Sequence, residues 1–483
     1  MLKKLLSLFM SLTVLLGLLS GCSKQTSSDD TEKFKGKEVT IYIRMMEAQD
    51  KWFRENIIAA FEQKYGVKIN VRTFEKDTDL HNILELDKDK NTIALVKVPF
   101  MQIYPLAKKG LIMSLDEAVG EKYKEDIKEY VDKAIEMATI DGKVYYIPRK
   151  LETNTLLYLK SKVEDAVNNW EKMKPQINKM FKKENGYGLP DGYTLEADPN
   201  QWDWYDLAVV GYYWANTPYN GTKEPRIAHR AKKYEGTVIE IMTKVYQMGG
   251  NQDDMLAMNT QPVKDTFQWE AFFKKNGLYN PAMWQEGWSG GGIWNAMAQG
   301  KVFLAFMHQI DAFFIHGGSD PSMQGFLANP DDMGLAIMPM GASLEIKDGQ
   351  PARVGGHHSQ AAGWWWGIPK STPDKELSYT LARFITNKEN HAKECATFGM
   401  MPIRKDIYEN LNENFKEVWM QDVFKTAMEQ ESQGILPAPM VSQWPAIQNL
   451  YLEAWYDIVV GDKDYSKTLD EVYAPKAKQE LSK

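Results

Sequence analysis

Tryptophans are the residues of this chain whose type and spacing most suggest chemistry. The chain holds 15 tryptophans, 23 tyrosines and 19 phenylalanines in 483 residues. An aromatic ring can cover a flat, partly polar molecule, and it can equally be buried in a core. Trp364, Trp365 and Trp366 stand together between two glycines. In a strand the first and third rings would face one side of the sheet and the middle ring the other. Each ring could therefore either pack in the core or contact a ligand.

A second group of tryptophans lies in or beside loops, where less core is available to cover a ring. A sugar presents an apolar face of C–H groups ringed by hydroxyls. Aromatic rings would cover that face, and Asp, Glu, Arg and Asn would pair with the hydroxyls. The pattern therefore indicates a ligand cleft lined with rings. The loop tryptophans are Trp202, Trp204, Trp284, Trp288, Trp294 and Trp444.

The histidines and the acids give little sign of a metal site or of an enzyme. His357 and His358 are adjacent and cannot easily face one ion, and the helical spacings HxxxH and HExxH are absent. No P-loop and no dinucleotide fingerprint occurs. Acids are plentiful, so a glycosidase pair stays open. We expect no metal, no cofactor and no catalysis.

The start of the chain indicates export and lipid attachment. Two lysines precede an apolar run over residues 5–19, and Leu19-Ser20-Gly21-Cys22 matches a lipobox. The run is short for a transmembrane helix, and small residues stand where cleavage would fall. We predict a signal peptide over 1–21, lipid on Cys22 at the outer face of the cytoplasmic membrane, and a flexible polar tether over 22–37.

Composition narrows the class of protein and of partner. The formal net charge is -7 and no basic stripe is present, which argues against nucleic acid. A hydrophobic content of 43% and a charged content of 25% are typical of a globular protein, and the length suits two or three domains. With Cys22 lipidated, Cys395 has no partner for a disulfide.

Apolar periodicity predicts alternating strands and helices. Residues 38–43 alternate like a strand, a helix follows with Asp50 as its expected cap, and residues 67–71 form the next strand. This βαβ unit predicts a parallel sheet. The apolar face of the helix is Phe53, Ile57, Phe61 and Tyr65. Further strands are expected at 93–98, 143–147, 156–159, 302–307, 334–337 and 363–368, with a hairpin at Asp141-Gly142.

Several longer segments follow one another in an order that resembles a known family. "GKVYYIPRKLETNTLLYLKSKV" is similar to a first crossing between lobes, and "MGLAIMPMG" to a strand ending in Pro-X-Gly. The most specific segment is "AGWWWGIPKSTPDKELSYTLARFITNKENHAKECATFGMMPIRKD". Together they resemble the extracellular solute-binding proteins of ABC importers, the family that includes maltose-binding protein. This resemblance implies an α/β, two-lobed periplasmic-binding-protein-like fold (type II), with mixed sheets flanked by helices and a hinge between the lobes.

The resemblance also implies boundaries and partners. An N-terminal lobe would comprise 38–147 and 312–370, and a C-terminal lobe 148–311 and 371–483. The lobes would close around a small solute, an oligosaccharide by this resemblance, and the closed form would be recognised by the permease subunits of an importer. We expect a monomer that is held at the membrane through its lipid.

Ligand contacts are implied only where segments align. Arg44 and Glu47 follow the first strand, where the family places polar contacts, and Glu152 matches a carboxylate that binds sugar hydroxyls. Trp202 and Trp204 lie near a position of the second lobe where the family has an aromatic contact. The other positions implied by the resemblance are Trp364, after a pair of small residues, Trp444, before the C-terminal helix, and Asp311.

Two departures from the family pattern leave the solute open. Asp311 stands where many relatives have a tryptophan, and "NTIALVKVP" replaces the usual Gly-X-Pro-Asp-Val. One alternative keeps the fold and binds a peptide or an organic anion through Arg44, Arg149 and Arg353. Another is a secreted enzyme acting on glycans, with two carboxylates roughly 5–10 Å apart across the cleft. A third is a lipoprotein that senses or scaffolds without a transporter.

Overall fold

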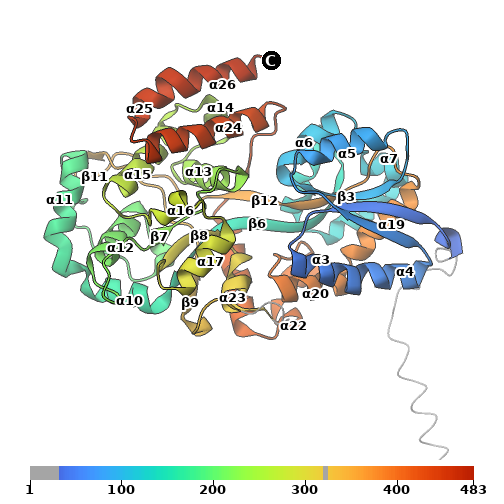
Figure 1. The fold of residues 1–483 in the computed structure, drawn as a ribbon, viewed down its shortest axis with the longest axis horizontal. Coiled ribbons are helices and arrows are strands. Elements are labelled where there is room, and N and C mark those ends of the chain that lie inside the picture. The colour runs from blue at the N-terminus through green and yellow to red at the C-terminus, as the bar shows by residue number, and fades with distance from the viewer. Residues whose placement is uncertain (1–31, 319–324) are drawn as a thin grey trace, which may run out of the picture.

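The computed structural model describes residues 32–318 and 325–483, and the predicted signal peptide and Cys22 lie outside these ranges. Figure 1 shows two α/β lobes side by side, joined by two long strands that cross between them. These strands are β6 (Tyr146–Leu159) and β12 (Ser359–Gly367). The predicted two-lobed α/β fold with a hinge is confirmed.

The first lobe is built on the predicted βαβ unit. Strand β1 (Glu38–Ile43) pairs in parallel with both β2 (Lys68–Thr73) and β3 (Ile93–Pro99). Its other elements are α5 (Asp79–Asp87), α6 (Phe100–Lys108), α7 (Leu115–Val119), α8 (Tyr123–Asp126), α9 (Asp132–Met137) and the hairpin β4 (Thr139–Ile140) with β5 (Lys143–Val144), which turns at the predicted Asp141-Gly142.

The helix between β1 and β2 packs as its periodicity predicted. The four apolar residues of its predicted face are at most 5% exposed, and Gly66 ends it in the left-handed conformation. The helix begins at Glu47, so the expected cap at Asp50 is wrong. Asp50 instead accepts a hydrogen bond from Arg54, one turn further on. The segments are α3 (Glu47–Phe53), η1 (Arg54–Ile58) and α4 (Ala59–Tyr65).

One sheet runs through both lobes in the order β2-β1-β3-β12-β6-β8-β7. Strand β12 pairs antiparallel with β3, and β6 pairs antiparallel with β12 and then with β8 and β9. The prediction of two separate strands, at 143–147 and 156–159, is wrong, because Pro148 lies inside β6. The pairing register shifts between Trp364 and Trp365, opposite Lys150 and Pro148. A bulge of this kind tolerates a residue that has no N–H to donate.

The second lobe covers the far half of β6 with helices (Figure 1). Its strands are β7 (Ile227–Ala228), β8 (Leu304–His308) and β9 (Met333–Ala336), with a small hairpin of β10 (Ile346–Lys347) and β11 (Gln350–Pro351). Its helices before β12 are α10 (Lys160–Asn169), α11 (Lys174–Asn185), α12 (Trp204–Asn216), α13 (Glu235–Gln247), α14 (Gln252–Ala257), α15 (Gln261–Lys275), α16 (Ala282–Gln285), α17 (Gly290–Ala298) and α18 (Asp311–His316).

The chain after β12 visits both lobes. Helix α19 (Lys375–Ile385) packs on β3 and α7, elements of the first lobe, whereas residues 371–483 were predicted in the second. Residues 312–370 were predicted in the first lobe, but β9 of this segment pairs with the far half of β6 and α18 packs on α17 and β8, so both lie in the second lobe. The remaining elements are α20 (Lys388–Phe398), α21 (Lys405–Tyr408), α22 (Leu411–Asn414), α23 (Val418–Ser432), β13 (Ile435–Pro437), α24 (Trp444–Trp455), η7 (Tyr456–Val460), α25 (Tyr465–Thr468), η8 (Leu469–Tyr473) and α26 (Ala474–Leu481).

The predicted tether ends earlier than residue 37. Phe34 is 1% exposed, and its ring lies 6.1 Å from that of Tyr65 in the first lobe. The backbone N–H of Gly36 donates to the carbonyl of Gly66. Residues 34–37 therefore pack on the domain, because a phenylalanine gains more from burial than a polar linker residue would.

Candidate functional site

A cavity of about 400 Å³ lies between the two lobes, against the crossing strands. Its volume is within the range of small-molecule sites. Both lobes and both strands contribute side chains, so closure of the lobes would enclose a ligand. The principal side chains of its wall are Arg44, Asp77, Lys97 and Phe100 of the first lobe, Lys150, Glu152 and Trp364 of the strands, and Arg230, Glu235, Trp294, His308, Asp311 and Phe314 of the second lobe.

One face of the crossing strands forms part of the cavity wall. Trp364 lies opposite Lys150, and Ala362 opposite Glu152, in the antiparallel pairing of β12 with β6. Directly opposed residues point to the same side of a sheet. Trp364 is half-buried and lines the cavity, whereas Trp365 and Trp366 are 0% exposed and belong to the core. One ring of the three is therefore available to a ligand.

A second aromatic wall comes from the second lobe. The ring of Trp294, on α17, stacks on that of Phe314, with centroids 4.5 Å apart and planes 17° from parallel. Its Nε1 donates to Oδ1 of Asp311 at 3.0 Å. Asp311 therefore fixes the orientation of a ring in the cleft, although this acid stands where the family resemblance implies a tryptophan.

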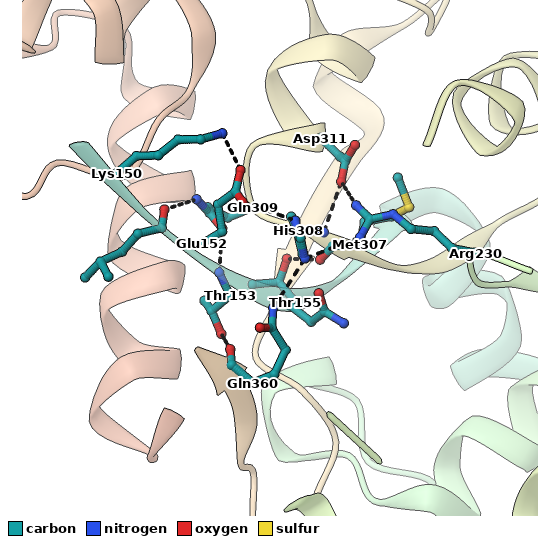
Figure 2. Close-up of polar contacts among 12 residues, drawn as sticks. Lys150, Glu152, Thr153, Thr155, Arg230, Met307, His308, Gln309, Asp311 and Gln360 are labelled. Atoms are coloured by element: carbon teal, nitrogen blue, oxygen red, sulfur yellow. Dashed lines mark hydrogen bonds and ion pairs between the residues drawn. The ribbon is translucent and has the colours of Figure 1, made fainter. Parts of the chain in front are cut away.

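A chain of polar contacts runs along the cavity from β6 to the second lobe (Figure 2). The ammonium of Lys150 donates to Glu152, and the other oxygen of Glu152 lies 4.0 Å from Nδ1 of His308. Nε2 of His308 lies 3.3 Å from Nη1 of Arg230, and Nη2 of the same guanidinium donates to Asp311 at 2.8 Å. Within the part of the chain that the structure describes, the second oxygen of Glu152 has no donor within hydrogen-bond distance, so it can accept from a ligand hydroxyl.

The protonation states of this chain follow from burial and neighbouring charges. Burial, together with the positive charge of Arg230, lowers the pKa of His308 to about 3. A guanidinium can only donate, so Nε2 of His308 accepts and Nδ1 keeps the proton. Burial alone would raise the pKa of Glu152, but the charges led by Lys150 bring it down to about 2. At neutral pH the cleft thus presents a carboxylate and an imidazole N–H.

Three charged side chains meet at the mouth of the cleft. Arg44 donates to Asp77 within the first lobe, and its other terminal nitrogen lies 3.6 Å from Glu235 of α13 in the second. Burial raises the pKa of Asp77, Arg44 opposes this rise, and Glu235 adds to it. The lobes are therefore joined by an ion pair across the cavity.

The buried neutral state of His308 predicts a dependence of stability on pH. An unfolded histidine titrates near 6.5, so between about pH 6 and pH 4 the unfolded chain binds one proton more than the folded chain at this site. Stability then falls as the pH falls, by about 1.4 kcal/mol per pH unit for one proton. We expect His308→Gln to reduce the slope of unfolding free energy against pH by about this amount. Urea unfolding at several pH values measures it, and an unchanged slope would contradict the prediction.

The structure brings together four of the eight ligand residues that the resemblance implied. Arg44, Glu152, Asp311 and Trp364 all line the cavity. Glu47 is exposed at the start of α3 and does not line it. That these residues contact a solute stays a prediction.

The other three predicted residues lie in packed regions. Trp202 is 0% exposed and donates to the carbonyl of Glu196, and Trp204 is 0% exposed and stacks on Phe306. Trp444 is 2% exposed, and its Nε1 contacts the sulfur of Met101 at 3.1 Å. Their placement in loops predicted exposure, but the helices of the second lobe and α6 cover them.

Several residues of the cleft were not predicted from the sequence. Lys97, Arg230 and Glu235 come from three distant segments, and no local motif joins them. A signal existed for Lys97, because a lysine inside the apolar run "IALVKVP" is unusual for a strand buried on both faces. Trp294 was noted as a loop tryptophan, but its place in the wall depends on Asp311.

The described residues offer neither a clustered metal site nor a membrane-spanning helix. In the ranges 32–318 and 325–483, no group of three or more histidine, cysteine, aspartate and glutamate side chains is arranged to hold a metal ion. In the same ranges no helix has the length and apolar character needed to cross a membrane.

Two α/β lobes around a cleft of small-molecule size define the class of two-lobed binding proteins. The chain belongs to the family of bacterial extracellular solute-binding proteins, which matches residues 56–426. The resemblance noted in the sequence is confirmed, and so is the expectation of a binding protein rather than an enzyme. Residues 287–291 do match the Gly-X-Ser-X-Gly pattern that places the nucleophilic serine in some hydrolases. In those enzymes the pattern follows a strand, whereas here it follows a turn after α16.

Relatives with described roles share part of the chain. It is 26% identical over 169 residues to a maltooligosaccharide ABC transporter solute-binding lipoprotein of Streptococcus pneumoniae (strain ATCC BAA-255 / R6), covering 33% of this chain and 38% of that protein. It is 26% identical over 166 residues to a galactooligosaccharide-binding protein of Bacillus subtilis (strain 168), covering 33% and 36%. The chain thus matches well under half the length of these relatives.

Solved structures support the fold over nearly the whole chain. A maltose-bound MalE3 of T. maritima superposes with a TM-score of 0.67 at 14% identity, covering 92% of this chain and 99% of that one. A solute-binding protein of Thermotoga lettingae TMO bound with alpha-D-tagatose has a TM-score of 0.65 at 20% identity, covering 92% and 100%. At these identities the likeness shows the fold alone.

Proposed function

We propose that this protein captures an oligosaccharide in the cleft between its lobes and delivers it to an ABC importer. The observation that supports this proposal best is the pairing of aromatic walls with a polar floor. Trp364 comes from a crossing strand, the stacked rings of Trp294 and Phe314 come from the second lobe, and Glu152 and His308 line the same cavity. Rings cover the C–H faces of a sugar, and a carboxylate with an imidazole N–H binds its hydroxyls.

The relatives point in the same direction. Two are named for maltooligosaccharides and galactooligosaccharides, and neighbours in fold hold maltose, alpha-D-tagatose or ribitol. The cavity of about 400 Å³ suits a short oligosaccharide better than a long chain. A peptide or an organic anion in place of the sugar is one outcome of a ligand screen.

The test is a thermal-shift screen of the chain from residue 23 against mono- and oligosaccharides, amino acids, peptides and phosphates, followed by calorimetry. A ligand that binds only the folded state raises the melting temperature by mass action. We expect Trp364→Ala to weaken sugar binding about tenfold or more, or ~1.4 kcal/mol, because a stacking surface is lost. Trp284→Ala, at a half-buried ring outside the cleft, is the control. Equal effects of both variants would contradict the prediction.

We also propose that Cys22 holds the lipid that keeps the protein at the outer face of the membrane. The lipobox and the lipoprotein names of the relatives support this. We expect labelled palmitate to enter the wild-type protein and not Cys22→Ser, which should appear in the medium. Two permease genes beside this gene would support delivery to an importer, whereas a lone sensor kinase gene would support a sensing role.

A further inference from the structure

Lys97 is the single charged residue of strand β3, all of whose residues are buried. It is 2% exposed, although a buried ammonium is strongly unfavourable unless an anion or several acceptors face it. A methionine of similar size would fill the same space at no electrostatic cost. The lysine is therefore unexplained by packing alone.

The groups in direct contact with the Lys97 ammonium are a carbonyl and an aromatic ring, both neutral. It donates to the backbone carbonyl of Arg44, and it lies 3.8 Å from the centre of the Trp364 ring. Among residues 32–318 and 325–483, no carboxylate oxygen lies within 4.0 Å of it. The other cations of the cleft each have a carboxylate partner, namely Arg44 with Asp77, Lys150 with Glu152, and Arg230 with Asp311.

The register of the sheet directs Lys97 toward the cavity. Lys97 lies opposite Trp366 on β12, and Trp364, two residues earlier, lies opposite Lys150 on β6. Residues two apart share a face of a strand, so Lys97, Trp364 and Lys150 stand on one side of the sheet, and all three line the cavity. An ammonium has three donors, and the carbonyl of Arg44 uses one.

The carboxylates nearest to Lys97 are paired with other cations, so among the described residues its ammonium has no carboxylate contact of its own. Burial lowers its pKa, and the positive charges of Arg149 and Lys150 lower it further, while two carboxylates oppose them. Arg149 is 0% exposed and is paired with Glu394 beneath the cavity floor. An anion in the cleft would give the ammonium of Lys97 the contact that it lacks. The charged groups around Lys97 are Arg44, Asp77, Arg149, Lys150, Glu152 and Glu394, and Arg230, Glu235 and Asp311 line the same cavity.

We propose that the solute is an acidic sugar and that Lys97 is the counterion of its single negative charge. The ammonium lies over the ring of Trp364, so the sugar unit that bears the charge would lie against the part of that ring that the ammonium leaves uncovered. One unpaired cation matches a monoanion, either the carboxylate of a uronic acid or a sulfate ester, whereas a phosphate monoester is close to doubly charged at neutral pH. This inference rests on the proposed sugar-binding function.

The first experiment compares matched ligands by calorimetry on the wild-type chain from residue 23. The panel holds oligogalacturonates, oligomannuronates and aldouronic acids, each beside its carboxyl-reduced neutral form, together with sulfated disaccharides. We expect an acidic member to bind roughly 10- to 100-fold more tightly than its reduced form, the range for a charged hydrogen bond. Binding of a sulfated disaccharide instead would assign the charge to the ester.

The outcomes separate this inference from the proposed function. If neutral oligosaccharides bind as tightly as the acidic ones, or alone, the acidic-sugar inference is overturned and sugar binding stands. If no sugar binds, while a peptide or a simple organic anion does, the sugar-binding proposal is overturned and the inference with it.

The second experiment changes the lysine. Lys97→Met should lose the preference for the acid while it keeps the affinity for the reduced neutral form. Lys108→Met is the matched control, because Lys108 also lies near an aromatic ring, that of Tyr104, but is exposed and outside the cleft. An equal loss of acidic and neutral binding in Lys97→Met would overturn the role of Lys97.

A third measurement needs no variant. An anion beside Lys97 raises the pKa of its ammonium, so binding of the acidic sugar should take up protons in solution. Calorimetry in two buffers of different ionisation enthalpy detects this uptake, which should grow as the pH rises. Binding of the acid without proton uptake at any pH at which the protein stays folded would contradict the assignment.

Discussion

Replacing Glu270 with leucine is expected to lower the free energy of unfolding by about 3–5 kcal/mol. Glu270, on α15, is 0% exposed, and burial alone would raise its pKa, but Lys244 and His229 outweigh burial and lower it. Its removal would leave the buried ammonium of Lys244 without an anion. The donors that would lose their acceptor are Lys244 at 2.6 Å, Tyr279 at 2.7 Å and Trp455 at 2.7 Å, and Nε2 of His229 lies 3.2 Å from a Glu270 oxygen.

Urea denaturation of the wild-type protein and of Glu270→Leu measures this loss of stability. Glu389→Leu is the matched control, because Glu389 also pairs with a lysine on a helix, but its side chain is 75% exposed. An exposed pair of this kind contributes about 0.5 kcal/mol or less. If Glu270→Leu unfolds at the same urea concentration as Glu389→Leu, the buried cluster is not a stabilising element of the second lobe.

The Glu270 cluster supports the wall of the cleft from behind. Lys244 and Glu240 lie one turn apart on α13. Glu240 accepts from Asn154 on β6 and lies 3.5 Å from Arg230, which in turn contacts His308 and Asp311 in the cavity. A chain of buried charges therefore connects the core of the second lobe to the residues proposed to meet the solute.

Local pattern was enough to predict the elements whose contacts are close in sequence. The helix over Phe53 to Tyr65, the βαβ unit and the hairpin at Asp141-Gly142 depend on spacing and turn chemistry within a few residues. The continuous strand β6 was missed, since its passage through Pro148 depends on a bulge against β12, more than two hundred residues away in the chain.

The site was only partly predictable for the same reason. A tryptophan in a loop is covered or open according to distant elements, so the sequence could not separate Trp204, stacked in the core, from Trp294, which lines the cleft. The resemblance predicted Glu152 and Trp364 at the ligand site, and both line the cavity because they lie on the crossing strands. The resemblance could not predict Lys97 at the site, because this lysine lies in a segment where the chain departs from the family pattern.

Gly363→Ala is the substitution expected to disturb the hinge most. The backbone φ of Gly363 is +150°, and a methyl group there would lie 2.1 Å from the carbonyl oxygen of Lys150 and 3.1 Å from the Cα of Leu151. Both are backbone atoms of β6, so no side-chain rotation can relieve the clash. The two crossing strands would have to separate. We expect a loss of about 3 kcal/mol or more in the free energy of unfolding, from backbone strain and overpacking together.

The same change should weaken ligand binding, because Gly363 lines the cavity next to Trp364 and the strands on either side bear Lys97 and Glu152. Gly142→Ala is the matched control, since Gly142 also has a positive φ, +76°, but a methyl group at that position would meet no atom within 4 Å. That variant tests the backbone cost alone, about 1–2 kcal/mol. Urea unfolding and calorimetry with the ligand found by thermal shift compare the two. If both variants lose the same stability and both bind normally, β12 and β6 can separate at Gly363 at little cost. The hinge then does not depend on the close approach of these two strands.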